Sequence, residues 1–532
     1  KKYTFSQRPS YRLDAIGEYE VGEKKVAYEG TLNDLYENDL DKFVEYNIQD
    51  VRLVKKIDDK LDFIEIARGL AHLGHCSYED VFMSSRYLEG AILVYLRKKE
   101  IVAPNKPTGE NSKSGKFEGA YVQDPQKGKH DWVYDLDITS MYPSCIMSLN
   151  ISPETKLGKI EGWNPEQFIN KENKKTYSLI SKGKVIGRYT ETELKAMMDN
   201  EEIGIATNGV MYRTDKDGLL PALLRKWFDE RVEYRKLSKK FHEQGDKEKS
   251  DYFDRRQYLQ KVVLNSLYGV LGLPAFRFYD LDNAEAVTNT GQSLIKFTRK
   301  IGNAYYNKEL GDTKDYCIYI DTDSVFYSAL PLVKKRYPEL DTSNEDTMSK
   351  AILEIASEVQ EYLNNGYHYF AKKFCNLDEH RFDIKQEVIA KSGLFVTKKR
   401  YGLKIINDNG KKVDKMMVKG LDTVRSSFPV AMRTMLSKLL EDILMGVPKD
   451  KLDKFILNFK DSMKLMDFDK IAIPTSVKGV KKYKIDGGLF SSYAKGTPVH
   501  VKSALFYNDI LKHMKISKRY TEIFDGEKIK WV

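Results

Sequence analysis

Residues 316–327 read Tyr-Cys-Ile-Tyr-Ile-Asp-Thr-Asp-Ser-Val-Phe-Tyr and place two aspartates between two apolar runs. Both runs are rich in β-branched and aromatic residues, which predicts two short strands with Asp321-Thr322-Asp323 at their turn. Two carboxylates this close repel each other and need a compensating cation beside apolar strands. Magnesium suits carboxylate oxygens, so the pattern predicts a magnesium site. For this motif alone, a solvated Asp-rich turn is the alternative interpretation.

The composition describes a folded chain with several domains. Its 532 residues are too many for one core, and 41% are hydrophobic and 12% aromatic. The net charge of +10 favours a polyanionic partner. The 4 cysteines are widely separated and form no Cys-x-x-Cys pair, which excludes a recognisable disulfide framework or zinc motif.

Targeting signals are missing from the sequence as given. It contains no run of about 18 apolar residues and no signal-peptide pattern, so we expect a soluble, cytoplasmic protein with no membrane partner. The sequence begins with Lys1 rather than methionine, and we expect it to be a fragment.

The first part of the chain is predicted to change from strands and turns to helix. Residues 1–30 have the composition of strands and turns, whereas apolar residues recur at helical spacing from Leu40 to Ile64. On that helix Tyr46 and Asp50 share a face because they are four residues apart. A strand is expected from Trp132 to Ile138, ending before a proline turn.

Two long helices at roughly 220–242 and 250–268 predict an antiparallel helical hairpin. On the second helix, Lys261, Asn265 and Tyr268 share one face, and Gly269 is placed to end the helix. A cation, an amide and an aromatic ring in one row suit a triphosphate with its base. An ordinary solvated helix face is the alternative.

The last part of the chain combines strands, helices and basic residues. After a helix expected near 346–374 come a strand with Glu387 and a strand containing Lys398-Lys399-Arg400-Tyr401. These cations can protect a sheet edge or bind phosphates. Residues 426–532 are expected to form a separate, basic subdomain that includes Lys478 and Lys481.

Taken together, these motifs resemble those of B-family DNA polymerases. Residues 137–143, Asp-Ile-Thr-Ser-Met-Tyr-Pro, are similar to the family's palm motif Asp-x-x-Ser-Leu-Tyr-Pro. Residues 261–269 match Lys-x-x-x-Asn-Ser-x-Tyr-Gly of the fingers, and residues 321–324 match the second palm motif, with Ile320 where glycine is often found. Residues 399–401 resemble the Lys-x-Tyr element that touches the duplex. Order and spacing also agree over nearly the whole chain.

The resemblance implies an α+β right-hand polymerase fold with an antiparallel palm sheet, helical-hairpin fingers and a mixed thumb. Residues 150–155, Asn-Ile-Ser-Pro-Glu-Thr, are further similar to replicative polymerases of large tailed bacteriophages, which implies DNA replication in a host bacterial cytoplasm. The expected segments are an exonuclease remnant at 1–60, a connection at 61–115, palm at 116–218 and 279–425, fingers at 219–278 and thumb at 426–532.

The resemblance also implies a reaction and its ligands: a primer 3′-hydroxyl attacks a dNTP on primer–template DNA, with two Mg²⁺ ions for which Mn²⁺ can substitute. Asp135 falls outside the motif and is expected to lie outside the metal site. The implied residues are Asp137, Ile138 and Asp323 for metal, Asp321 and Glu387 as auxiliary acids, Lys261 for phosphate and proton donation, Ser140, Met141, Tyr142, Arg231, Arg235, Asn265 and Tyr268 for the nucleotide, and Lys398, Lys399, Arg400, Tyr401, Lys478 and Lys481 for DNA.

Residues 46–50 resemble the third exonuclease motif, Tyr-x-x-x-Asp. The family's other exonuclease carboxylates lie upstream in an Asp-x-Glu strand, which residues 1–45 lack. We therefore expect polymerisation without proofreading. Either the chain is truncated or a separate N-terminal polypeptide supplies the missing motifs. A sliding clamp is a further expected partner, although its binding peptide is not in this chain.

Two other functions are alternatives to DNA synthesis. Reverse transcription or RNA synthesis also uses paired acids, but reverse transcriptases usually carry adjacent aspartates, which Thr322 separates here. A DNA-binding scaffold with a degenerate palm is contradicted by the joint presence of Asp137, Asp323, Lys261 and Asn265.

Overall fold

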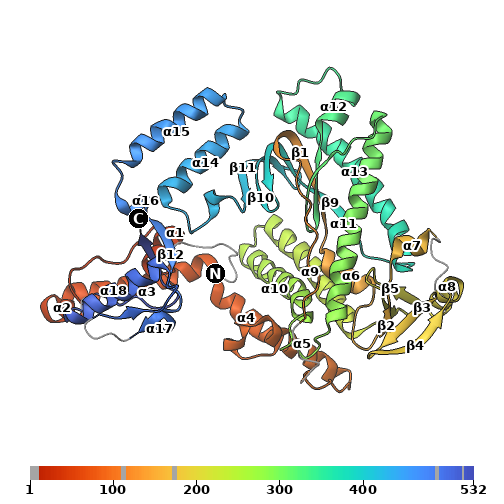
Figure 1. Ribbon diagram of the computed structural model, residues 1–532, viewed down its shortest axis with the longest axis horizontal. Coiled ribbons are helices and arrows are strands. Elements are labelled where there is room, and N and C mark those ends of the chain that lie inside the picture. Colours follow the sequence, from red (N-terminus) through yellow and green to blue (C-terminus); the bar gives the residue numbers. More distant parts are fainter. Residues whose placement is uncertain (1–10, 109–114, 171–175, 486–489, 518–519, 532) are drawn as a thin grey trace. The chain divides into compact units, whose positions relative to one another are not determined.

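The computed structural model describes residues 11–108, 115–170, 176–485, 490–517 and 520–531. It divides into a larger unit, Ile66–Met417, and a smaller unit made of Lys1–Glu65 with Val418–Val532. Figure 1 traces both units. Among the described residues, no helix has the length and apolar character needed to cross a membrane.

A six-stranded sheet forms the centre of the larger unit. Its strand order is β11-β10-β9-β1-β8-β7, and β1 pairs antiparallel with both β8 and β9. The strands are β1 (Gly128–Ile138), β7 (Cys317–Asp321), β8 (Ser324–Ser328), β9 (Ile384–Thr397), β10 (Arg400–Asp408) and β11 (Lys411–Lys419). The strands expected around Asp137, Asp321 and Glu387 are thus confirmed.

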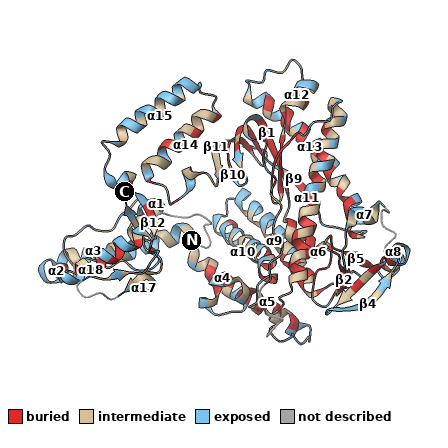
Figure 2. Cartoon of the chain, viewed as in Figure 1, coloured by how far each residue is buried: buried red, intermediate tan, exposed pale blue. Residues whose placement is uncertain are grey.

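Two long helices, α11 (Leu281–Leu310) and α13 (Glu345–Cys375), pack against each other and against this sheet. Figure 2 shows much of β1, β7, β8 and β10 buried, whereas β11 at the sheet edge is intermediate or exposed. An aromatic cluster that includes Tyr319, Phe326 and Phe395 fills part of the core. The helix expected near 346–374 is confirmed as α13.

The helical hairpin is formed by α9 (Leu219–Glu243) and α10 (Lys247–Leu271), and the Asp246 side chain caps the second helix. The prediction that Gly269 ends this helix is wrong. Gly269 lies inside α10, where a Cβ atom would meet nothing within 4 Å, and the helix ends at Leu271 before Gly272.

Other elements of the larger unit flank these parts. A second, antiparallel sheet has the order β4-β3-β2-β6-β5. Its strands and the neighbouring helices are β2 (Lys156–Ile160), β3 (Tyr177–Ser181), β4 (Lys184–Tyr189), β5 (Ile203–Ile205), β6 (Val210–Arg213), α5 (Ser84–Lys98), α6 (Met141–Ser148), α7 (Pro165–Ile169), α8 (Glu191–Asn200) and α12 (Leu330–Arg336). The helix α4 (Phe63–Gly74) begins at the division between the units.

The smaller unit combines helices from both ends of the chain with short strands. In its described part, the expectation of strands within residues 1–30 is wrong, because α1 is helical and ends at Gly22 in the left-handed conformation. The elements are α1 (Leu13–Val21), α2 (Leu32–Asn38), α3 (Leu40–Leu61), α14 (Val430–Leu444), α15 (Lys449–Met463), α16 (Phe468–Ile471), α17 (Val480–Tyr483), α18 (Val499–His513), β12 (Ile473–Ser476), β13 (Lys484–Ile485), β14 (Ser492–Tyr493) and β15 (Lys528–Trp531).

Candidate active site

The turn between β7 and β8 presents Asp323. Asp321 pairs with Ser324, which leaves Thr322 and Asp323 as a two-residue hairpin loop. Thr322 has a φ of 71°, and its N–H donates to the Tyr121 carbonyl at 3.2 Å. A neighbouring segment therefore fixes the strained turn.

Pairing between β1 and β8 brings Asp137 beside this turn. Asp137 lies opposite Ser324 in the register, and the N–H of Ile138 donates to the Asp323 carbonyl at 2.8 Å. Two acids that are far apart in the sequence thus meet at the same end of adjacent strands, as their motifs led us to expect.

The surroundings of these acids disfavour negative charge. Burial, together with the charges of Asp323 and Glu387, raises the pKa of Asp137 to about 8. Burial, together with the charges of Asp321 and Glu387, raises the pKa of Asp323 to about 6. A cation placed between the carboxylates would reverse both effects.

The donor set fits a divalent cation. Carboxylate oxygens are the ligands that magnesium prefers. Within the part of the chain that the structure describes, neither Asp137 nor Asp323 forms an ion pair with Lys or Arg. No cluster of three or more His, Cys, Asp or Glu side chains among the same residues has the geometry of a metal site. The structure therefore supports a carboxylate pair, with Glu387 acting on it through its charge.

Asp321 has a different environment, because the Lys399 ammonium lies 2.6 Å from its carboxylate. Burial, together with the charge of the nearby Asp321, raises the pKa of the Tyr401 hydroxyl. Lys399 has a φ of 57° in the turn after β9, and its N–H donates to the Tyr319 hydroxyl at 2.6 Å. The ion pair with Lys399 gives the Asp321 carboxylate a cationic partner at the end of β7.

The other expected DNA-binding residues fall into three environments. The expectation that 398–401 lies on one strand is only partly right, since Lys398 and Lys399 form the turn and β10 begins at Arg400. Lys398 lies 3.3 Å from Asp124. The ring of Tyr401 is 4% exposed and packs in the aromatic core. Lys478 and Lys481 belong to the smaller unit.

The nucleotide residues of the first motif contact the helical hairpin. Ser140 has a φ of 49° and precedes α6, and the rings of Tyr142 and Tyr268 lie 4.3 Å apart. Gly291 on α11 packs closely against this motif, because a Cβ there would lie 3.0 Å from Met141 and 3.3 Å from Tyr142. Burial raises the pKa of the Tyr142 phenol.

The cations of the hairpin differ in exposure, since Lys261 and Arg235 are exposed and Arg231 is partly buried. Lys261 and Asn265 are exposed on α10. Burial and the charge of Asp408 raise the pKa of Glu387, and the charge of Lys261 opposes this rise. On α9, burial and then the charge of Arg235 lower the pKa of Arg231. In the described part of the chain, Lys261, Arg231 and Arg235 form no ion pair with a carboxylate, which leaves them available to an anion.

Tyr46 and Asp50 share a face of α3 and form a separate site in the smaller unit. Lys25 lies 2.8 Å from the Asp50 carboxylate and donates to the Tyr46 hydroxyl. No local sequence pattern marks Lys25 as a partner of Tyr46 and Asp50, because this contact depends on tertiary structure. The aspartates upstream of Tyr46 lie in the first turns or at the N-caps of helices: Asp14, Asp34, Asp39 and Asp41.

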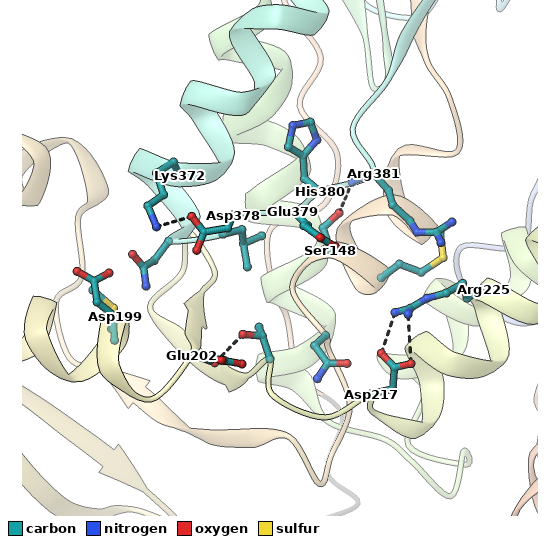
Figure 3. A pocket seen from close by; sticks show the side chains of 16 residues that line it. Ser148, Asp199, Glu202, Asp217, Arg225, Lys372, Asp378, Glu379, His380 and Arg381 are labelled. Atoms are coloured by element: carbon teal, nitrogen blue, oxygen red, sulfur yellow. Dashed lines mark hydrogen bonds and ion pairs between the residues drawn. The ribbon is translucent and has the colours of Figure 1, made fainter.

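A polar cavity of about 820 Å³ lies elsewhere in the larger unit (Figure 3). Its wall contains the ion pairs Lys372–Asp378 at 2.7 Å and Arg225–Asp217 at 3.0 Å. None of the site residues expected from the sequence lines this cavity. It is distinct from the Asp137–Asp323 pair.

Comparison with known proteins defines the class of the chain. The sequence model of DNA polymerase family B matches residues 83–505, so the chain belongs to this family. It is similar to the DNA-directed DNA polymerase of Escherichia phage RB69, with 26% identity over 99% of this chain and 61% of the relative. The corresponding polymerase of Enterobacteria phage T4 is 24% identical over 99% of this chain and 62% of the relative.

An archaeal relative extends the comparison. DNA polymerase 1 of Pyrococcus abyssi is 28% identical over 82% of this chain and 47% of the relative. The chain thus spans about three fifths of its phage relatives and about half of this archaeal one. The family resemblance and the similarity to phage polymerases are confirmed. Family membership also implies the use of a divalent metal ion.

Proposed function

We propose that this chain carries out template-directed DNA synthesis, adding dNMP from a dNTP to a primer 3′-hydroxyl, in viral DNA replication. The observation that carries the proposal is the meeting of Asp137 and Asp323 at the ends of β1 and β8, without a compensating basic partner in the described residues. The names of the phage and archaeal relatives support it.

In this proposal the chain forms a right-hand polymerase. The central sheet and its helices would be the palm, at 116–218 and 279–425, and the α9–α10 hairpin the fingers, at 219–278. Residues 426–532 would be the thumb, 1–60 an exonuclease remnant and 61–115 the connection. The antiparallel sheet and the hairpin support this assignment.

Asp137, Asp323 and the Ile138 carbonyl would hold two Mg²⁺ ions, with Glu387 nearby. When bound, these ions activate the 3′-hydroxyl and neutralise charge on the attacking and leaving oxygens. Asp321 acts indirectly, because Lys399 already neutralises it.

The hairpin residues bind the triphosphate. Lys261, Arg231 and Arg235 would contact the β- and γ-phosphates through charge-assisted hydrogen bonds. Lys261 would also give a proton to the departing pyrophosphate. A Lys261→Leu variant tests this role: single-turnover rates should fall and their pH profile should change. An unchanged rate and profile would exclude it.

The sugar and base occupy the space beside Tyr142. Ser140 and Met141 shape the backbone around this space. Asn265 and Tyr268 of α10 provide further contacts to the nucleotide. The duplex would contact Lys398, Lys399 and Arg400, together with Lys478 and Lys481 of the thumb, with Tyr401 acting through Asp321. A sliding clamp and a separate exonuclease polypeptide remain expected partners.

Primer extension with Mg²⁺ tests the proposal. The wild-type chain should extend a primed DNA template with dNTPs, and extension on RNA templates or with rNTPs should be far weaker. Asp137→Ala and Asp323→Ala should each lower the rate by several orders of magnitude while primer–template binding persists.

Asp131→Ala is the matched control, since Asp131 lies on the same strand but is exposed and pairs with Lys129. It should extend as the wild type does. An Asp137→Ala or Asp323→Ala variant that keeps a tenth of the wild-type rate would contradict the metal assignment, and equal use of RNA templates would favour reverse transcription.

A further inference from the structure

The pairing of β1 with β9 contains a bulge beside the acidic site. Tyr134 pairs with Ile389, and Leu136 pairs with Gln386. One residue of β1, Asp135, therefore lies opposite two residues of β9, Glu387 and Val388.

The bulge decides which face of the sheet Glu387 occupies. Directly opposite residues share a face, so Lys385 lies on the face of Asp137, and Glu387 follows two residues later on the same face. Ile389 is a further two residues along but pairs with Tyr134 on the opposite, buried face. Without the extra residue, Glu387 and Ile389 would share one face.

Asp135 satisfies the backbone that the bulge leaves out of the ladder. Its side chain is buried, and its carboxylate accepts the N–H of Val388 at 2.7 Å. The backbone of Glu387 also favours the charged form of Asp135, against the effect of burial on its pKa. An unpaired buried N–H costs about 1–3 kcal/mol, so the carboxylate stabilises this local conformation over a regular strand.

Glu387 in turn acts on the acid pair. Its charge contributes to the raised pKa values of both Asp137 and Asp323. Burial raises the pKa of Glu387 itself, and Lys261 lies near enough for its positive charge to oppose that rise. The face that Glu387 occupies therefore affects the electrostatics of the candidate metal site.

We propose that Asp135 is a positioning residue for this site: it contacts neither metal nor substrate, but holds the β9 bulge that keeps Glu387 on the face of Asp137 and Asp323. The inference rests on the metal site of the proposed function and adds a residue outside the recognised motif. The buried side chain of Asp135, and not the pairing of the strands alone, would then determine the position of Glu387.

Mn²⁺ binding to the protein without DNA, measured by electron paramagnetic resonance, tests the proposal independently of turnover. Asp135→Leu should weaken Mn²⁺ binding about as much as Glu387→Ala does, by about 10- to 100-fold, the usual effect of losing a residue that orients a metal site. The double variant should bind no more weakly than either single variant, because both changes remove the same contribution.

Asp135→Asn should give intermediate binding. Its remaining oxygen can accept the Val388 N–H, but the neutral amide loses the favourable interaction of the carboxylate charge with the Glu387 backbone. Tyr134→Phe is the matched control, because it removes a buried hydrogen bond of 2.9 Å to Tyr306 from the adjacent position of the same strand. It should lower thermal stability and leave Mn²⁺ binding unchanged.

Hydrogen exchange of the peptide covering β9 gives a second readout, and it should be faster in the Asp135 variants than in Tyr134→Phe. If Asp135→Leu does not fold, Asp135→Asn supports the same comparison. The proposal would be overturned if the Asp135 variants had the same Mn²⁺ binding and β9 exchange as Tyr134→Phe. Additive effects of the Asp135 and Glu387 changes on Mn²⁺ binding would also overturn it. Failure of the proposed function would appear separately, as a wild-type chain that does not extend primers.

Discussion

The ring of Tyr142 lies against the ring of Tyr268, with their centroids 4.3 Å apart and their planes inclined by 35°. This contact joins α6, which follows the first acidic strand, to α10 of the helical hairpin. Gly291 leaves no spare space on one side of Tyr142, so the ring cannot easily move in that direction. A substrate atom that collides with this ring would therefore be rejected rather than accommodated.

Replacing Tyr142 with alanine should relax discrimination against ribonucleotides. The ring packs below the incoming sugar in the proposed function, where a 2′-hydroxyl would collide with it. We expect rNTP use to rise by about 10- to 200-fold, the range that one steric mismatch produces, without a matching loss of dNTP use. Single-nucleotide incorporation kinetics measure both, and Tyr142→Phe, which keeps the ring, should retain discrimination. Unchanged rNTP use in Tyr142→Ala would place the sugar gate elsewhere.

Lys399→Ala should weaken the salt dependence of duplex binding. Its side chain is 61% exposed although it pairs with Asp321, so it remains accessible to a phosphate. Each phosphate contact contributes a slope of roughly −0.9 in log K against log salt, and the variant should lose about one such contribution for every sequence. Fluorescence anisotropy over a series of KCl concentrations measures the slope.

Lys412→Ala is the control for this slope, because Lys412 pairs with Asp346 near the opposite end of the β10–β11 hairpin. It should leave the slope unchanged. A Lys399→Ala variant with an unchanged slope but slower nucleotide addition would show that Lys399 acts only by holding Asp321.

Stability should decrease in acid through His380, which lines the polar cavity in Figure 3. Its Nε2 lies 3.0 Å from Nδ1 of His368, and its Nδ1 accepts the Phe382 N–H. Burial, and then the charge of His368, lower the pKa of His380 to about 4. The unfolded chain then binds more protons than the folded one between about pH 4 and 6.5, so this contribution is present above pH 6.5 and is lost as the pH falls toward 4.

Thermal melts at pH 7.5 and pH 5 measure this effect. The His380→Asn variant should lose less stability on acidification than the wild type, by roughly 2 °C in Tm. His72→Gln, an exposed histidine in α4, should behave as the wild type does. An equal acid-induced loss in His380→Asn and wild type would contradict the assignment.

The chain by itself should not digest a 3′-mismatched primer. Hydrolysis by two metal ions needs more carboxylates than Asp50, and Asp50 already pairs with Lys25. The assay incubates the purified chain with a mismatched primer and Mg²⁺ in the absence of dNTPs. As a positive control, a separate 3′–5′ exonuclease should digest the same primer. Digestion by the chain alone would contradict the prediction. Digestion that needs an added N-terminal polypeptide and is lost in Asp50→Ala would establish a split enzyme.

Local patterns predicted the parts of the site whose signals are local. The strands around Asp321 and Asp323 follow from their β-branched and aromatic flanks, and α9 and α10 from helical periodicity. Lys25 and the pairing of Lys399 with Asp321 had no such signal, because each depends on residues brought together by tertiary structure.

The helix α1 shows a second reason why a prediction from the sequence was wrong: strands and turns were expected where the chain is helical. Gly17 lies in its middle and lowers its intrinsic helix propensity. A Cβ at Gly17 would lie 3.1 Å from the Leu53 side chain on α3, so the glycine allows the close packing of the two helices. Tertiary packing thus stabilises a segment that its own sequence disfavours as helix.

The position of β1 between β8 and β9 has a consequence for synthesis on the ribosome. Asp137 emerges long before Ser324 and Ile384, so neither edge of β1 has its strand partner while the intervening chain is made. Val133 and Leu136, buried in the finished sheet, would meanwhile be exposed on an unpaired strand, which is a template for aggregation. Closing such long loops is also entropically costly. The nascent chain should therefore need protection by a chaperone until β9 has been translated, and the acidic pair should form only in the last stage of folding.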